Sequence, residues 1–143
     1  MPDFMTPAQR SRAMSAVRAS GTQIERTLCS ELHRRGFRFR KNVKNLSGRP
    51  DIVLPRYRCA IFVHGCFWHH HRNCARSKLP TTRTAFWTKK IQDNVQRDRR
   101  QILRLRKDGW LVIVVWECQL RNTRVRESVL EKLISRIEGG HAS

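Results

Sequence analysis

Residues 48–64 read GRPDIVLPRYRCAIFVH, and this stretch decides the fold. It holds two short strand-like segments, Asp51 to Leu54, which is apolar after its first residue, and Cys59 to Val63, with Pro55-Arg56 at the turn between them. Short apolar runs bounded by Gly and Pro are typical of buried strands joined by a hairpin. The core of the chain is therefore predicted to form on a β-hairpin.

The segments on either side of the hairpin show helical or strand periodicity. A capping box, Thr22 with Glu25, opens a helix that Gly36 ends, and alternating Phe and Arg predict a strand over 37–43. The remaining pattern predicts a basic N-terminal helix over 6–19, a long helix over 84–107, a central strand over 110–116 and an amphipathic helix over 124–138. Together these elements predict an α/β fold, with a mixed central sheet flanked by helices.

A chain of 143 residues has the usual length of one domain, and no linker divides it. We expect a single domain over 1–143, with a basic arm at 1–20 and a loose tail at 139–143. The apolar runs are shorter than the ~18 residues that span a bilayer, and the N-terminus lacks the layout of a signal peptide. We therefore expect a soluble, cytoplasmic protein.

The net charge is strongly positive, because 30 Lys and Arg residues stand against 11 Asp and Glu residues, giving +19. Such an excess opposes compact folding by self-repulsion unless a polyanion neutralises it. Nucleic acid is therefore the predicted partner. Composition alone also allows a solvated basic face or a ribosome-type RNA binder.

Residues 66–74 read CFWHHHRNC and offer sulfur and imidazole ligands within nine residues. A structural zinc needs four such ligands, and Cys118 follows the strand predicted over 110–116. Cys66, Cys74, Cys118 and one of the three histidines are predicted to form a closed Cys₃His site. The alternative is that Cys118 belongs to the core and the histidines form a polar turn. Cys29 and Cys59 lie in periodic apolar patterns, which assign both to the core.

Asp51 stands apart from the other carboxylates, most of which lie on polar helix faces. It follows Gly48-Arg49-Pro50 at the start of a buried strand, where its side chain is held rigidly. A carboxylate there suits a Mg²⁺ ligand for phosphodiester hydrolysis, because a hard cation prefers oxygen ligands. A structural Asp that caps the turn is the alternative.

The Pro50-Asp51 pair, the hairpin and the second strand resemble the core of restriction-type nucleases. Phe62, Val63 and His64 stand where those enzymes carry an acid, a spacer and a lysine. This difference, with FVHGCFWH at 62–69, resembles the very short patch repair (Vsr) mismatch endonucleases. The matching segments are Arg10-Ser11 with Met14, 22–25, 48–51, 62–74, 82–84 with 86–87, 94–100 and 110–118.

The resemblance implies a restriction-endonuclease-like core with a structural Zn²⁺ and a catalytic Mg²⁺. It implies an enzyme that nicks double-stranded DNA 5′ to the thymine of T:G mismatches left by deamination of 5-methylcytosine. Asp51 would bind Mg²⁺ with the backbone carbonyl of Val63. His69 would activate the attacking water, Glu25 would support it near the hydrated metal, and His64 would contact a phosphate.

The resemblance also implies DNA-contacting residues and partners. Phe67, Trp68 and Trp87 would enter the base stack beside the mismatch, although helical spacing also allows Trp87 to pack in the core. The arm would contribute Met14, Arg10 and Arg12. We expect a monomer that acts at the nucleoid, with a functional link to a cytosine-5 DNA methyltransferase and to mismatch repair proteins.

The resemblance selects His71 as the histidine of the zinc site. Two residues separate His71 from Cys74 where the family usually has one, so the sequence leaves His70 open. Two further functions stay open at this point: a restriction-type endonuclease on the same core, and a zinc-containing DNA-binding module without chemistry.

Overall fold

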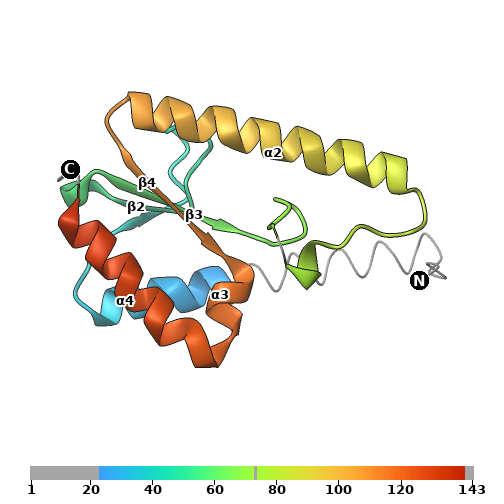
Figure 1. Ribbon diagram of the computed structural model, residues 1–143. Coiled ribbons are helices and arrows are strands. Elements are labelled where there is room, and N and C mark those ends of the chain that lie inside the picture. The colour runs from blue at the N-terminus through green and yellow to red at the C-terminus, as the bar shows by residue number, and fades with distance from the viewer. Residues whose placement is uncertain (1–22, 73, 141–143) are drawn as a thin grey trace.

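Four strands form one mixed sheet in the computed structural model, which describes residues 23–72 and 74–140 (Figure 1). Their order across the sheet follows the chain: β1 (Arg40–Lys41), β2 (Ile52–Leu54), β3 (Cys59–His64) and β4 (Leu111–Trp116). β2 pairs antiparallel with both β1 and β3, whereas β4 is parallel to β3. The predicted helix over 6–19, Thr22 of the capping box and residues 141–143 of the predicted tail lie outside the described residues.

The predicted hairpin is confirmed by the pairing of β2 with β3. Ile52 lies opposite Ile61, and Leu54 lies opposite Cys59. The connection is a 3₁₀ turn over Pro55–Tyr57, closed by Arg58 in the left-handed region at φ 46°. Every residue of β2 is buried, so the hairpin supplies the centre of the core.

The long helix α2 (Thr84–Lys107) connects β3 to β4 and covers one face of the sheet (Figure 1). A parallel pair of strands needs such a crossover connection. Ile102 and Leu105 of α2 pack with Phe62 and Val112 of the sheet. With 24 residues the helix is about 36 Å long, so its first half extends beyond the sheet and lies over the loop that follows β3.

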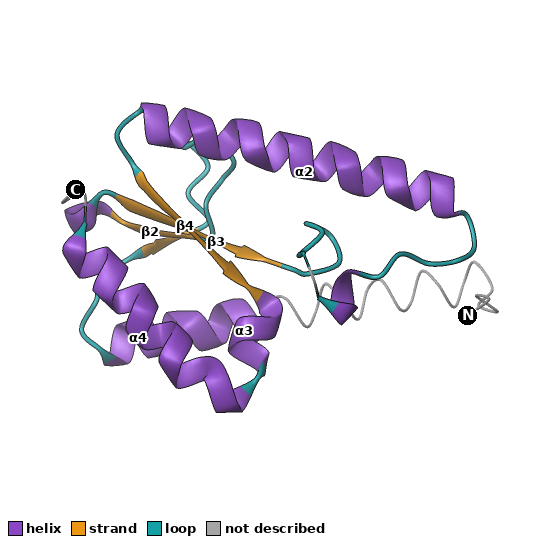
Figure 2. Cartoon of the chain, viewed as in Figure 1, coloured by secondary structure: helices purple, strands orange, loops and turns teal. Residues whose placement is uncertain are grey.

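The opposite face is covered by a helix over 23–34, by α3 (Glu117–Arg121) and by α4 (Thr123–Gly139), which gives three layers (Figure 2). Successive strand residues point to opposite faces, so Ile113 and Val115 face these helices while Val112 faces α2. The larger core cluster includes Ile24, Leu28, Leu32, Ile52, Leu54, Cys59, Ile61, Leu120, Leu130, Leu133 and Ile137. The assignment of Cys29 and Cys59 to the core is confirmed, since both are buried there.

Two predictions about the strands are wrong in detail. Within 37–43, the strand itself is limited to β1, because the chain leaves the extended conformation at Asn42, φ 51°. The N–H groups of Asn42 and Val43 still donate to the carbonyls of Asp51 and Pro50. The strand predicted as central, 110–116, is β4 at the edge of the sheet. Its apolar sequence reflects helices on both of its faces, which bury an edge strand as fully as a central one.

In the described part of the chain, no helix combines the length and the apolar character needed to cross a membrane.

Candidate active site and metal cluster

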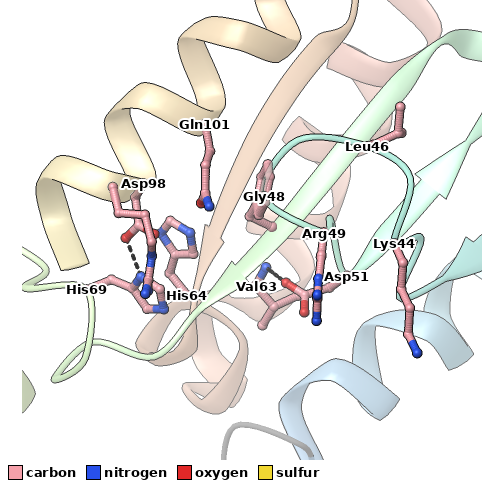
Figure 3. Close-up of a pocket in the computed structure, with 12 residues that line it drawn as sticks. Lys44, Leu46, Gly48, Arg49, Asp51, Val63, His64, His69, Asp98 and Gln101 are labelled. Atoms are coloured by element: carbon pink, nitrogen blue, oxygen red, sulfur yellow. Dashed lines mark hydrogen bonds and ion pairs between the residues drawn. The ribbon is translucent and has the colours of Figure 1, made fainter.

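An open pocket of about 450 Å³ lies where β3 ends, between the turn before β2 and the middle of α2. Its lining combines one carboxylate from the turn, two histidines from β3 and the following loop, and a second carboxylate from α2 (Figure 3). These four residues are Asp51, His64, His69 and Asp98. The pocket is also lined by three cationic side chains, Lys44, Arg49 and Arg97.

Asp51 is held by the backbone of β3. Its Oδ2 accepts a hydrogen bond of 2.7 Å from the N–H of Val63. Burial raises the pKa of the Asp51 carboxyl from 3.8 to about 6, against the opposing effect of the Val63 hydrogen bond, and the charge of Glu25 raises it further. Because burial disfavours the ionised form of Asp51, a cation bound beside the carboxylate would stabilise that form.

The turn before Asp51 contains Gly48 in a backbone conformation that favours glycine. Gly48 has φ +78°, and a Cβ at this position would lie 3.0 Å from Cβ of Gln101 on α2 and 3.1 Å from the ring of Phe62. The turn therefore packs directly against α2 and β3, which fixes the chain two residues before Pro50.

His69 and His64 form a stacked pair beside Asp98. Their ring centroids are 3.9 Å apart and their planes differ by 5°. The Nδ1 of His69 is hydrogen-bonded to Oδ2 of Asp98 (Figure 3). Burial, with a smaller effect from the charge of His69, lowers the pKa of His64 to about 3, so this imidazole is neutral at physiological pH.

The group His64, His69 and Asp98 offers three ligand atoms within 4.8 Å of one another. A metal ion lies near the plane of an imidazole that ligates it, and two parallel rings 3.9 Å apart share no such position. The arrangement therefore fits a hydrogen-bonded acid–imidazole pair backed by a neutral ring. Hard divalent cations prefer oxygen donors, and Asp51 and Val63, which also line the pocket, offer carboxylate and carbonyl oxygens.

Glu25 lies on the helix over 23–34 and is half-buried. It is absent from the pocket lining among the described residues, yet its charge acts on Asp51. Glu25 is therefore close enough to Asp51 to act on its carboxyl electrostatically, without lining the pocket.

The second group of chemical interest is the Cys/His cluster, which joins residues from the loop after β3 to Cys118 of α3. One ligand atom from each of Cys66, His71, Cys74 and Cys118 lies within 4.8 Å of the other three. Nδ1 of His71 is 3.6 Å from Sγ of Cys66 and 3.4 Å from Sγ of Cys118. A tetrahedral zinc with bonds of roughly 2.3 Å to sulfur and 2.0–2.1 Å to nitrogen separates such ligands by about 3.6 Å.

The choice between the two neighbouring histidines follows from the loop geometry. His71 points to the three thiols, whereas His70 is exposed and has φ 51°. The loop is braced by Ser77, whose hydroxyl donates to the carbonyls of His71 at 2.8 Å and of Cys74 at 2.7 Å. The donor set, three soft sulfurs and one imidazole, fits a closed zinc site.

Burial raises the pKa of the Cys66 thiol to about 12 and also raises that of Cys118. Because metals bind the thiolate, a zinc ion at this cluster would displace protons on binding and would bind more weakly as the pH falls.

Three aromatic side chains of the loop and of the start of α2 pack together. Trp87 lies 5.7 Å from Phe67 and 6.1 Å from Trp68, measured between ring centroids. Trp87 is half-buried against these two rings and lies outside both core clusters, so its contacts are with the loop. Phe86, which the sequence did not single out, is 47% exposed and contacts Trp87 at 5.1 Å.

Asp98 is a site residue that the sequence patterns did not predict, because most carboxylates other than Asp51 were assigned to polar helix faces. Spacing in the sequence could have indicated a shared role, because Asn94, Asp98 and Gln101 stand at i, i+4 and i+7 and so lie on one side of α2. All three face the site: Asn94 donates to the carbonyl of Trp68 at 3.2 Å, Asp98 binds His69, and Gln101 contacts Gly48. The predicted contacts Arg10, Arg12 and Met14 lie outside the described residues.

Comparison with known proteins shows the family to which the chain belongs. The sequence profile described as DNA mismatch endonuclease Vsr matches residues 2–76. The chain is 48% identical to the DNA mismatch endonuclease Vsr of Escherichia coli (strain K12), over all of this chain and 92% of that protein. It is 42% identical to the type II nicking enzyme V.XorIIP of Xanthomonas oryzae pv. oryzae, over 94% of this chain and 98% of that protein.

A third relative is the type II nicking enzyme V.NmeAIP of Neisseria meningitidis serogroup A, 40% identical over 96% of this chain and 98% of that protein. The chain therefore belongs to the Vsr family of DNA mismatch endonucleases. The family resemblance and the class of enzyme predicted from the sequence, a DNA endonuclease, are confirmed.

Proposed function

We propose that the protein is a Mg²⁺-dependent nickase that cuts double-stranded DNA 5′ to the thymine of T:G mismatches. Such mismatches arise when 5-methylcytosine deaminates, and the nick begins very short patch repair. The observation that carries the proposal is the placement of Asp51 and the His69–Asp98 pair in one open pocket. The similarity to mismatch endonucleases over the whole chain supports the choice of substrate.

In this proposal each side chain of the pocket has one task. His69 takes a proton from the attacking water, while Asp98 holds the ring and stabilises its protonated form. His64 is neutral, so it contacts a phosphate oxygen by donating one N–H rather than by charge. Lys44, Arg49 and Arg97 draw the DNA backbone toward the pocket.

Asp51 and the carbonyl of Val63 would hold Mg²⁺, with Glu25 supporting its hydration from the helix behind. When bound, the cation supplies charge stabilisation for the pentacoordinate transition state and lowers the pKa of its water.

Phe67, Trp68 and Trp87 form the surface that enters the base stack in our proposal. Unstacking costs a few kcal/mol per step and costs least at a mispair, so insertion itself favours mismatched DNA. Arg10, Arg12 and Met14 would contact the DNA from the N-terminal arm.

We further propose that the core is restriction-endonuclease-like, that the cluster at Cys66, His71, Cys74 and Cys118 holds a structural Zn²⁺, and that the chain acts as one monomeric domain on chromosomal DNA. A cytosine-5 DNA methyltransferase and mismatch repair proteins are the partners we expect in the pathway.

The substrate is tested with labelled duplexes that carry each mispair, or none, in the same flanking sequence. We expect single-strand cleavage of the thymine strand of T:G duplexes in Mg²⁺, and at least tenfold slower cleavage of paired DNA. Double-strand cleavage of fully paired DNA would identify a restriction-type enzyme instead. Tight duplex binding without cleavage would identify a zinc-containing DNA-binding module.

The role of Asp98 gives a second prediction. Asp98→Asn keeps the size of the side chain but removes the charge that stabilises a protonated His69. We expect the single-turnover nicking rate to fall by roughly 10- to 100-fold, a fraction of what a general base contributes. Asp108→Asn, on the exposed carboxylate at the end of α2, is the matched control. Equal rates for the two variants would contradict the assigned role.

A further inference from the structure

A continuous series of aromatic rings connects the Cys/His cluster to the pocket. The ring of His71 stacks on Trp116, with centroids 4.2 Å apart and planes 11° from parallel. Trp116 meets His64 edge-on at 5.2 Å and 76°, and His64 stacks on His69. The series therefore begins at a ligand of the cluster and ends at the imidazole that binds Asp98.

The backbone fixes Trp116 at the centre of this series. Trp116 is the last residue of β4 and lies directly opposite His64, the last residue of β3, in the parallel ladder. Residues paired in this way project to the same face of the sheet. The N–H of Trp116 donates to Oε1 of Gln119 at 2.9 Å, which holds the junction between β4 and α3.

Trp116 also lies two residues before Cys118, so one short segment carries both a cluster ligand and the bridging ring. We propose that Trp116 is a positioning residue, which fixes the ring planes of His71 and His64 and thereby the orientation of His69. Zinc binding at the Cys/His cluster and the orientation of His69 are thus coupled through the side chain of Trp116. This inference rests on the proposed function for its catalytic part, whereas its effect on the cluster is independent of that function.

The experiment compares Trp116→Leu and Trp116→Phe with Trp110→Leu in the full-length, zinc-loaded protein. Trp110 is the matched control, because it is a half-buried tryptophan at the opposite end of β4, about 20 Å away, packed on the smaller core cluster and under Arg58. Three quantities are measured: zinc transfer to a chromophoric chelator, the dissociation constant for a T:G duplex, and the single-turnover nicking rate at saturating enzyme.

We expect Trp116→Leu to release zinc several-fold faster and to nick roughly 10- to 100-fold more slowly, as a displacement of about 1 Å does in a catalytic site. Duplex affinity should stay within about twofold, because phosphate contacts dominate binding. Trp116→Phe retains a flat ring and should restore most of both rates. Trp110→Leu should change neither rate.

The proposal is overturned if Trp116→Leu nicks at the normal rate, if nicking falls while zinc release is unchanged, or if Phe is as impaired as Leu. It is also overturned if Trp110→Leu reproduces both defects, since loss of general stability would then explain them. Trp116→Met, whose unbranched side chain adapts better to an irregular space, replaces the Leu variant if that variant does not fold. A wild-type protein that fails to nick T:G duplexes contradicts the proposed function, while the zinc-release rates still decide the contact between Trp116 and the cluster.

Discussion

Asp51→Asn should reduce nicking of a T:G duplex by three orders of magnitude or more, roughly the several kcal/mol that a bound metal contributes to the transition state. The amide oxygen can still accept the N–H of Val63, so the turn before β2 keeps its position. Duplex affinity and zinc content should be unchanged. Asp93→Asn is the control, because Asp93 is an exposed carboxylate of α2 that faces Lys89.

The same variant should be more stable than the wild type at neutral pH without divalent cations. The folded-state pKa of Asp51 is about 6, above its ordinary value of 3.8, so the folded protein binds the proton more tightly than the unfolded chain. The resulting penalty is absent below about pH 4, grows between pH 4 and 6, and is complete above pH 6.

Thermal or urea unfolding of the two proteins checks this sign. At pH 7 we expect Asp51→Asn to gain about 1–3 kcal/mol in the free energy of unfolding, a range set by the pKa difference. Near pH 4 the difference should disappear. Mg²⁺ should stabilise the wild type but not the variant. A variant less stable than the wild type at pH 7 would contradict the conclusion that desolvation of the partly buried Asp51 carboxylate costs folding free energy.

Removing zinc should have the largest effect on folding. A structural zinc contributes on the order of 10–16 kcal/mol of apparent free energy at neutral pH, comparable to the whole stability of a small domain. Cys118→Ser removes the ligand that ties α3 to the loop after β3. We expect this variant, and the wild type treated with a strong chelator, to lose zinc and to unfold well below the temperature of the zinc-loaded protein.

Cys29→Ala is the matched control, because Cys29 is a buried cysteine of the core that takes no part in the cluster. It should retain one zinc per chain and lose only the small contribution of a buried thiol. Full zinc content in Cys118→Ser would contradict the predicted ligand set.

Sequence patterns predicted the hairpin, the long helix and the α/β class, because each depends on local periodicity within one segment. They failed for β4, whose burial comes from α2 on one face and α3 with α4 on the other. A strand covered by helices on both faces has the same apolar composition at the edge of a sheet as at its centre.

The candidate site was predicted where a motif lies within a few residues, as at Asp51 and at 66–74. Asp98 was not predicted because its role depends on which face of α2 packs against the loop after β3. That tertiary contact cannot be inferred from the local sequence. The stacking of His64 on His69, and of Trp116 on His71, likewise depends on the register of β3 against β4.

The pairing of β3 with its two neighbours has a consequence for how the protein becomes active during synthesis. Asp51 is oriented across the β2–β3 pair, whereas Cys118 reaches the loop only after β4 has added to the other edge of β3. A nascent chain that ends before residue 111 therefore lacks both the last strand and Cys118, although it already carries Asp51, His64 and His69. In the proposed enzyme, the ability to nick DNA therefore depends on docking of the last strand, which brings Cys118 to the loop after β3.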